Sequence, residues 1–354
     1  MRIASVEVVP YALPFREPYV TAAGSLTQRE MVLLRLRDDS GLIGLGEAVP
    51  LSLRGGANLA TVAEELGRLG ERDALDEASL RGDAPALSTP ARCAALIALL
   101  DLRGKRAAAE GGVSAGPSPP VRCNATLTAG DPATVVSAAQ SWAADGFSTF
   151  KLKLGTGDDA AQVRTVREAL GPRAQIRVDA NGVWDVETAK RTLSELEPYE
   201  VELAEQPVGT LEEAMEVARS TSIPLSGDES IESRADAERA VAMEACRMTG
   251  VKLSKVGGPE AAVEIAEVLP AYLSSALDGP VGIAAAAQVA ATLGEATGGG
   301  PNLAHGLATQ RLFASTIASV ECRLEGDMLH LPDGPGLGVE IDEAALDAHR
   351  LDVR

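Results

Sequence analysis

The stretch Phe150-Lys151-Leu152-Lys153-Leu154-Gly155 alternates lysine with leucine, which is the pattern of a β-strand with two different faces. A similar stretch, Val251-Lys252-Leu253-Ser254-Lys255, follows later in the chain. Together they hold four of the six lysines among 354 residues, and nearly all other positive charge comes from arginine. A buried lysine amine can lose its proton, whereas a guanidinium cannot, so we expect these lysines to take part in chemistry.

Single ionisable residues recur at the ends of candidate strands, and the intervals between them are regular. Lys153 and Asp179 are 26 residues apart, Asp179 and Glu205 are 26 apart, Glu205 and Asp228 are 23 apart, and Asp228 and Lys252 are 24 apart. These intervals approach one β/α unit of a barrel, which is roughly 30 residues long. Taken singly, each residue could be an ordinary turn, cap or surface residue. Because the C-terminal ends of barrel strands open onto one face, their common register predicts that they converge there.

Strand-like and helix-like segments alternate from residue 121 onward. Eight strands in this alternation predict an α/β fold with a modified (β/α)8 barrel of TIM type, rather than a doubly wound sheet. The candidate strands are Val121–Leu127, Ser148–Gly155, Gln175–Asp179, Val201–Glu205, Ile223–Asp228, Gly250–Ser254, Ala271–Ala276 and Asn302–Gly306.

The N-terminal third follows a different pattern. Residues 2–9, 31–37 and 41–47 alternate apolar and polar positions and predict an antiparallel meander. Helical periodicity follows at residues 59–69 and 89–103. These elements predict a separate α+β domain.

A stretch rich in glycine and proline, residues 111–120, indicates a domain boundary because it suits neither a helix nor a central strand. We therefore expect the N-terminal α+β domain to span residues 1–118 and the barrel to span residues 119–312. Residues 313–354 contain short strand-like runs, and we expect them to return to the N-terminal domain.

Composition excludes several classes of partner. The chain has 32 Lys and Arg against 51 Asp and Glu, a net charge of −19, so neither nucleic acid nor an anionic membrane surface is expected to bind it. We find neither the features of a signal peptide nor a span of about 20 apolar residues, which predicts a cytoplasmic protein. Its four cysteines are widely scattered, which favours buried thiols over disulfides or a zinc site.

Three of the recurring residues, Asp179, Glu205 and Asp228, are carboxylates, and no His or Cys accompanies them. Such a donor set suits Mg²⁺ better than zinc. Buried charges are costly unless they compensate one another or hold an ion. Lysines on either side of a divalent cation fit removal of a proton α to a carboxylate, because the cation stabilises the enediolate and burial lowers the pKa of a lysine.

Further motifs accompany these residues through almost the whole chain. They are Gly44-Leu45-Gly46-Glu47-Ala48-Val49-Pro50-Leu51, Lys151-Leu152-Lys153, Asp179-Ala180-Asn181-Gly182, Glu205-Gln206-Pro207, Gly227-Asp228-Glu229-Ser230, Lys252 with Gly257-Gly258, and Ser274-Ser275-Ala276-Leu277-Asp278. Together they resemble the motifs of the enolase superfamily, muconate-lactonising subgroup. Within that subgroup they are most similar to the o-succinylbenzoate synthase family.

The resemblance implies specific roles for individual residues. Asp179, Glu205 and Asp228 would ligate Mg²⁺. Lys153 would remove the α-proton and then protonate the departing hydroxyl, while Lys252 on the opposite face would stabilise the enolate by its charge. Substrate binding is implied for Lys151, Asn181, Ser275 and Arg29. The N-terminal α+β domain would be a capping domain, and Arg29 would lie in or beside its loop that closes over the site. Supporting positions behind the site are implied for Glu229 and Lys255.

The activity implied by the resemblance is Mg²⁺-dependent syn-dehydration of 2-succinyl-6-hydroxy-2,4-cyclohexadiene-1-carboxylate to 2-succinylbenzoate through an enediolate, a step of menaquinone biosynthesis. The substrate would thus be a small carboxylate, and a homo-oligomer is among the expectations, since the subgroup commonly associates.

Other activities stay open. An N-acylamino acid racemase, or a related epimerase or cycloisomerase, needs the same lysine pair. A dipeptide epimerase would carry Asp-x-Asp on the last barrel strand, where this chain has Ala304-His305-Gly306-Leu307. A non-catalytic binding protein on the same scaffold is a third alternative, but it would have no reason to keep costly inward charges.

Overall fold

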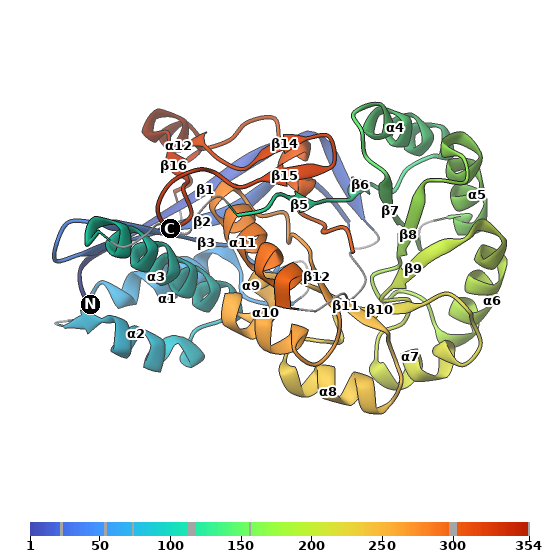
Figure 1. Cartoon of the computed structure of the whole chain (residues 1–354), viewed down its shortest axis with the longest axis horizontal. Helices are drawn as coiled ribbons and strands as arrows, with labels where there is room; N and C mark the ends of the chain where they lie inside the picture. The colour runs from blue at the N-terminus through green and yellow to red at the C-terminus, as the bar shows by residue number, and fades with distance from the viewer. Residues whose placement is uncertain are drawn as a thin grey trace.

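The computed structural model describes residues 1–21, 24–52, 55–72, 74–111, 118–155, 157–296 and 303–352. Its two main parts are an N-terminal antiparallel sheet with its own helices and a parallel barrel surrounded by helices (Figure 1). The predicted α/β class and the predicted combination of a capping domain with a barrel are confirmed.

The capping sheet contains β1 (Arg2–Thr21), β2 (Gly24–Asp38), β3 (Ile43–Ala48) and β4 (Leu75–Asp76), in the order β3-β2-β1-β4. Its pairs are antiparallel, so the predicted meander is confirmed, although β1 and β2 are much longer than the alternating stretches in the sequence.

Both faces of the capping sheet are buried, which explains the unbroken apolar run in β2. Val32 and Leu34 point into a core shared with α1 (Leu59–Leu69) and α3 (Thr89–Ala109), whereas Leu33 points into the core shared with the barrel. Alternate residues of a strand face opposite sides of the sheet. The sheet therefore joins the capping helices to the barrel. Two shorter helices complete this region, α2 (Glu77–Asp83) and the 3₁₀ helix η2 (Ala84–Ala86).

In the part of the chain that the structure describes, seven parallel strands form the barrel sheet, and each is hydrogen-bonded to its neighbour in chain order. The strands are β6 (Ala125–Leu127), β7 (Thr149–Lys153), β8 (Gln175–Asp179), β9 (Val201–Glu205), β10 (Leu225–Gly227), β11 (Met248–Val251) and β12 (Ala271–Leu273). The helices around them are α4 (Pro132–Ala144), α5 (Asp159–Leu170), α6 (Val186–Leu196), η3 (Glu197–Tyr199), α7 (Leu211–Ala218), α8 (Arg234–Ala242), α9 (Leu253–Val256), α10 (Pro259–Ala266), α11 (Pro280–Ala296) and η4 (Ala308–Leu312).

A short eighth segment closes the barrel. In place of the predicted strand Asn302–Gly306, two parallel bridges join His305 to Cys123 and Gly306 to Ser274. Asn302 itself lies outside the described residues.

The sixth predicted strand is wrong at its C-terminal end. Residue Val251 ends β11, and Lys252 is the N-cap of α9. The predicted strand Gly250–Ser254 is therefore too long, because Ser254 lies in a helical turn.

The first predicted strand, Val121–Leu127, is divided into two. Its start is β5 (Val121–Arg122), which leaves the barrel and pairs antiparallel with β15 (Met328–His330). β6 alone belongs to the barrel sheet.

The C-terminal segment contacts both parts of the molecule. Besides β15 it contains β13 (Ala318–Val320), β14 (Arg323–Glu325), β16 (Glu340–Ile341) and α12 (Glu343–His349). Glu343 forms an ion pair of 2.7 Å with Arg35 of β2, and Arg350 forms a bridge with Tyr11 of β1. The domain limits at residues 118 and 312 stay predictions, and residues 112–117 lie outside the described part.

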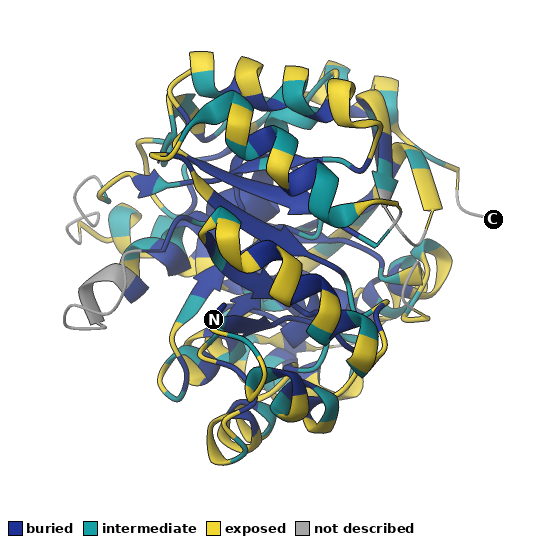
Figure 2. Cartoon of the chain, turned by 90° about the vertical axis from the view of Figure 1, so that its right-hand side faces the viewer, coloured by how far each residue is buried: buried dark blue, intermediate teal, exposed yellow. Residues whose placement is uncertain are grey.

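The barrel strands are buried, while the surrounding helices expose their outer faces (Figure 2). All four cysteines are buried and free. No helix in the described part of the chain is long and apolar enough to cross a membrane.

Candidate active site

The five regularly spaced residues meet at one mouth of the barrel. Lys153, Asp179 and Glu205 are the last residues of β7, β8 and β9, Asp228 follows β10 directly, and Lys252 follows β11. Lys153 lies in register with Asp179, and Asp179 with Glu205. All five side chains are buried. The predicted convergence is therefore observed.

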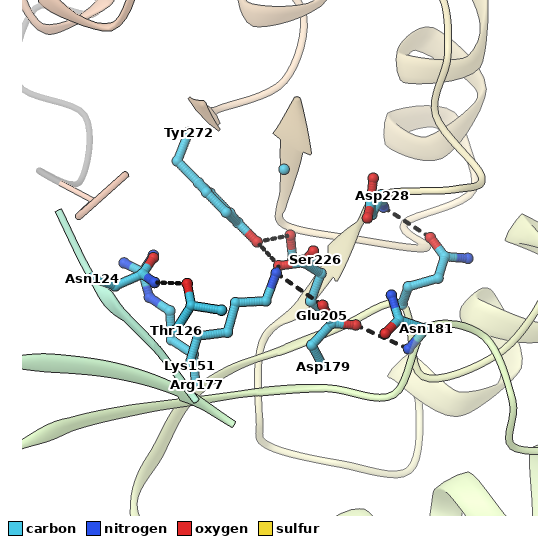
Figure 3. Close-up of polar contacts among 12 residues, drawn as sticks. Asn124, Thr126, Lys151, Arg177, Asp179, Asn181, Glu205, Ser226, Asp228 and Tyr272 are labelled. Atoms are coloured by element: carbon cyan, nitrogen blue, oxygen red, sulfur yellow. Dashed lines mark hydrogen bonds and ion pairs between the residues drawn. The ribbon is translucent and has the colours of Figure 1, made fainter. Parts of the chain in front are cut away.

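The Lys151 amine joins two of the carboxylates, Asp179 and Glu205 (Figure 3). Lys151 Nζ lies 2.9 Å from Asp179 Oδ2 and 2.6 Å from Glu205 Oε2. Lys153 Nζ lies 2.6 Å from Asp179 Oδ2 and donates to Asn181 Oδ1 at 2.9 Å. Burial by itself would raise the pKa of Asp179, but the two ammonium groups hold it well below its usual value. Asp179 is thus ionised and compensated by both lysines.

The pKa of Lys153 moves in the opposite direction. Burial lowers it, but the Asp179 carboxylate outweighs burial and raises the pKa of Lys153 above its ordinary value. In this arrangement the amine is an ammonium group. It can act as a base only when the Asp179 carboxylate stabilises its protonated form less strongly.

Asp228 is fixed from several sides. It forms ion pairs with Lys252 through Oδ2 and with Lys255 through Oδ1, the second at 2.9 Å. Lys255 Nζ also donates to the Asp228 carbonyl and, at 3.0 Å, to the Ile231 carbonyl. The Asp228 backbone N–H donates to Gln206 Oε1 at 2.8 Å. Lys255 therefore fixes both the side chain and the backbone of Asp228.

Asn181 links Lys153 to Glu229. While its Oδ1 accepts from Lys153, its Nδ2 donates to Glu229 Oε1 at 3.1 Å. Asn181 has a left-handed backbone with φ 49°, which asparagine tolerates better than most residues. The short turn after β8 therefore orients Asn181 toward Lys153.

A cavity of about 310 Å³ lies over this mouth, between the barrel and the capping domain. Arg29 lies within β2, and Ser275 follows β12; both line the cavity. Arg29 donates from Nη2 to the Pro50 carbonyl at 2.9 Å. The cavity is lined by Tyr19, Leu26, Arg29, Pro50, Leu51, Thr126, Lys151, Lys153, Asn181, Val183, Glu229, Lys252, Lys255, Ser274, Ser275, Ala276, Leu277, Gly306 and Thr309. The site is therefore built from both parts of the chain.

Sequence reasoning missed a polar layer below the mouth. Tyr272 donates its hydroxyl to Glu205 Oε2 and lies 3.2 Å from Ser226 Oγ (Figure 3). The Arg177 guanidinium lies 5.1 Å from the centre of the Tyr272 ring and donates to Glu202 at 2.6 Å. Arg177 has the same strand parity as Asp179, which could have indicated its inward direction. No comparable signal marks Tyr272.

A second missed residue is Glu47 of β3. Its Oε2 accepts from the Tyr11 hydroxyl at 2.8 Å, and its Oε1 accepts from the Gly279 N–H at 2.6 Å. Burial, together with the negative charge of Asp278, raises the pKa of Glu47 to about 7. Glu47 was visible as part of the motif Gly44–Leu51, but the sequence does not show what it contacts.

The pKa of Glu47 leads to a prediction for stability. The folded protein binds this proton more tightly than the unfolded chain, whose carboxyl titrates near 4.5. This proton binding stabilises the folded state fully at a pH below the pKa of Glu47 in the unfolded chain. The stabilisation is lost as the pH rises through the pKa of Glu47 in the folded protein. We expect the free energy of unfolding to fall by on the order of 3 kcal/mol from this group between about pH 4.5 and about pH 7. Denaturant unfolding of the wild type and of Glu47→Gln, which cannot titrate, should show different pH slopes, and equal slopes would contradict the assignment.

Asp179, Glu205 and Asp228 are the candidate ligands of a divalent cation. Among the described residues, no group of three or more His, Cys, Asp or Glu side chains is arranged to hold a metal ion. The amines of Lys151, Lys252 and Lys255 form ion pairs with Glu205 and Asp228. Glu205 Oε1, however, is buried without a hydrogen-bond partner among the described residues, and burial raises the pKa of this carboxyl. Hard oxygen donors, one of them unsatisfied, fit Mg²⁺ chemically. Occupation would require the cation to share these carboxylates with the lysine amines.

Comparison with known proteins identifies the family. Residues 133–345 match the family described as "Enolase C-terminal domain-like", and residues 3–110 match "Mandelate racemase / muconate lactonizing enzyme, N-terminal domain".

One similar protein is an o-succinylbenzoate synthase of Thermobifida fusca, 40% identical over 204 residues. That alignment spans 56% of this chain and 62% of the relative.

Two solved structures are similar over nearly the whole chain. A muconate lactonizing enzyme from Pseudomonas fluorescens, complexed with muconolactone, is 27% identical with a TM-score of 0.88 and covers 99% of each chain. A dipeptide epimerase from Enterococcus faecalis V583, complexed with Mg and the dipeptide L-Leu-L-Tyr, is 26% identical with a TM-score of 0.85 and covers 96% of this chain and 100% of the other. The chain therefore belongs to the enolase superfamily and, within it, to the muconate-lactonising subgroup.

Proposed function

We propose that this protein is an o-succinylbenzoate synthase, which dehydrates 2-succinyl-6-hydroxy-2,4-cyclohexadiene-1-carboxylate to 2-succinylbenzoate. The observation that carries the proposal is that Lys153 and Lys252 line one cavity beside three buried carboxylates. The partial similarity to the Thermobifida fusca synthase supports it.

The lysines would divide the chemistry. Lys153 would take the proton from the α-carbon of the substrate and return it to the departing hydroxyl on the same face, which releases water. Lys252 would stay protonated and stabilise the negative charge that develops on the carboxylate. Lys151 would hold Asp179 and Glu205 in place.

Asp179, Glu205 and Asp228 would hold Mg²⁺, and Mg was present in the similar epimerase structure. When bound, the cation would supply positive charge that stabilises an enediolate and lowers the pKa of a neighbouring lysine. Asn181 would then keep the Lys153 amine directed into the cavity, through the contact of 2.9 Å.

The last barrel segment argues against a dipeptide epimerase. Ala304, His305 and Gly306 stand where such an enzyme is expected to carry Asp-x-Asp. A Cβ added at Gly306 would lie 2.8 Å from Ser274 Oγ, so a side chain there would displace Ser274. The cavity wall at this point therefore offers no carboxylate for the amino group of a dipeptide.

An N-acylamino acid racemase is the second candidate. Because the amines of Lys153, at the end of β7, and of Lys252, directly after β11, both reach the cavity, protons could be exchanged on two faces of an α-carbon. The same pair of lysines would serve a racemase and a synthase equally well, so only substrate specificity separates the two activities.

A substrate panel tests the proposal. We expect the purified protein with Mg²⁺ to abolish the diene absorbance of the cyclohexadiene substrate, and EDTA to prevent this. The same preparation should be assayed for solvent deuterium exchange with N-succinylamino acids and with dipeptides. Exchange with N-succinylamino acids but no loss of diene absorbance would establish the racemase instead. A folded protein that binds Mg²⁺ yet is inert in all three assays would refute both candidates.

A further inference from the structure

One wall of the cavity is the loop between β12 and α11. Ser274, Ser275, Ala276 and Leu277 of this loop all line the cavity. Asp278 closes the loop on itself, because its Oδ2 accepts from Ser275 Oγ at 2.8 Å and from the Ala276 N–H at 2.7 Å. The loop conformation is costly, since Leu277 has φ 67°, a left-handed value that a leucine rarely adopts.

The capping domain holds this loop at its C-terminal end. Besides the bond from Gly279, the Glu47 carboxylate accepts longer hydrogen bonds of 3.3 Å from the N–H groups of Val281 and Gly282. These N–H groups belong to the first turn of α11, which carries a partial positive charge. A carboxylate from β3 thus accepts hydrogen bonds from the backbone N–H groups at the start of α11, immediately after the cavity loop.

The backbone of α11 leaves room for this carboxylate. A Cβ at Gly279 would lie 2.7 Å from Glu47 Oε2 and would also collide with the Tyr11 hydroxyl. A Cβ at Gly282 would lie 2.8 Å from Glu47 Oε1. Neither glycine has a positive φ, so the backbone conformation does not require glycine at these positions. The contacts with Glu47 require it, because a side chain would occupy the space of the carboxylate. Both sides of the interface are therefore shaped for Glu47.

We propose that Glu47, held by the Tyr11 hydroxyl, is a positioning residue through which the capping domain sets the place of the Ser274–Asp278 loop against the substrate. The proposal rests on the function proposed above only for the identity of that substrate. Glu47 does not line the cavity, so its effect must pass through α11 and the loop. The internal hydrogen bonds of the loop join Ser275 and Ala276 to Asp278 and do not reach Gly279. Loss of the Glu47 contact therefore frees the C-terminal end of the loop.

The first test measures the loop itself and needs no substrate. Hydrogen exchange, followed by mass spectrometry on peptides that contain Gly279, Val281 and Gly282, should be about tenfold faster in Glu47→Ala than in the wild type. Asp101→Asn is the matched control. Asp101 is also a buried capping-domain carboxylate, but it accepts its bonds of 2.7 Å from the N–H groups of Leu45 and Leu337, which belong neither to the cavity loop nor to α11. Equal exchange at α11 in both variants would overturn the proposal.

The second test measures the consequence for turnover of the cyclohexadiene substrate. We expect kcat/KM of Glu47→Ala to fall by about 10- to 100-fold, mainly through KM, because a misplaced wall weakens substrate positioning. Glu47→Gln, which keeps an acceptor for Gly279, should recover most of this loss. Asp101→Asn should lower the thermal midpoint and leave KM unchanged. If Asp101→Asn raised KM as much as Glu47→Ala, Glu47 would be merely structural.

A third variant approaches the contact from the barrel side. Gly279→Ala should raise KM in the wild-type background, because all three nearest atoms to the added Cβ belong to Tyr11 and Glu47. In a Tyr11→Phe/Glu47→Ala background, the same change should have little further effect, and additive effects would contradict the coupling. If the wild type turns over no cyclohexadiene substrate, the proposed function fails, while the exchange experiment still decides whether Glu47 holds the loop.

Discussion

Lys153→Ala is expected to lower turnover by about 10³- to 10⁴-fold, because the variant lacks the amine that removes the α-proton. Solvent deuterium incorporation into the substrate or product should fall in parallel. The fold should survive, since Asp179 keeps its ion pair of 2.9 Å with Lys151 when Lys153 is removed. Circular dichroism and the thermal midpoint can verify this.

Lys190→Ala is the matched control for this experiment. Lys190 lies on α6, where it forms a surface ion pair of 2.6 Å with Glu216. Such pairs contribute little to stability, so turnover and thermal midpoint should both stay near the wild-type values. A folded Lys153→Ala enzyme that retains more than a tenth of wild-type turnover would show that another group is the base.

Glu205→Gln is expected to abolish the stabilisation of the protein by Mg²⁺. A ligand that binds only the folded state stabilises it by about 2.7 kcal/mol at one hundred times its Kd, so the thermal midpoint of the wild type should rise as Mg²⁺ is added. The substitution keeps the size of Glu205 but removes its negative charge. Oε1 of this carboxylate is buried and has no hydrogen-bond partner among the described residues. Its midpoint should therefore be nearly independent of Mg²⁺, and Mg²⁺-dependent turnover should be lost.

Glu216→Gln serves as the control, because Glu216 is an exposed carboxylate at the surface ion pair with Lys190. Its response to Mg²⁺ should match that of the wild type, as measured by thermal shift and by calorimetric titration. If Glu205→Gln bound Mg²⁺ as tightly as the wild type, Glu205 would not be a ligand, and the role implied by its motif would be wrong.

Much of the architecture could be predicted because it follows from periodicity. Alternation in Lys151-Leu152-Lys153 reports a strand with one polar face, and the intervals from Lys153 to Lys252 report the length of a β/α unit. These are local properties of the chain, and parallel strands then bring their C-terminal ends to one mouth. The convergence of the site is therefore predictable from the sequence.

Element ends were less predictable, because they depend on contacts that the periodicity does not contain. Val121–Arg122 alternates like a barrel strand, yet it pairs with β15, a segment of the C-terminal part. The run after Val251 continues the strand pattern, yet the chain turns into α9 at Lys252. In both places, packing decided between two local structures that the sequence allowed.

The sequence by itself determined the strand register, the inward direction of the lysines and carboxylates, and the family to which the chain belongs. Only the tertiary structure decided which groups meet across the interior: Tyr272 with Glu205, and Glu47 with the first turn of α11. The physical reason is that these contacts join elements far apart in the chain, where no short-range period relates the partners. Their geometry depends on how the sheet, the helices and the capping domain pack as whole bodies, and it becomes visible only when that packing is known.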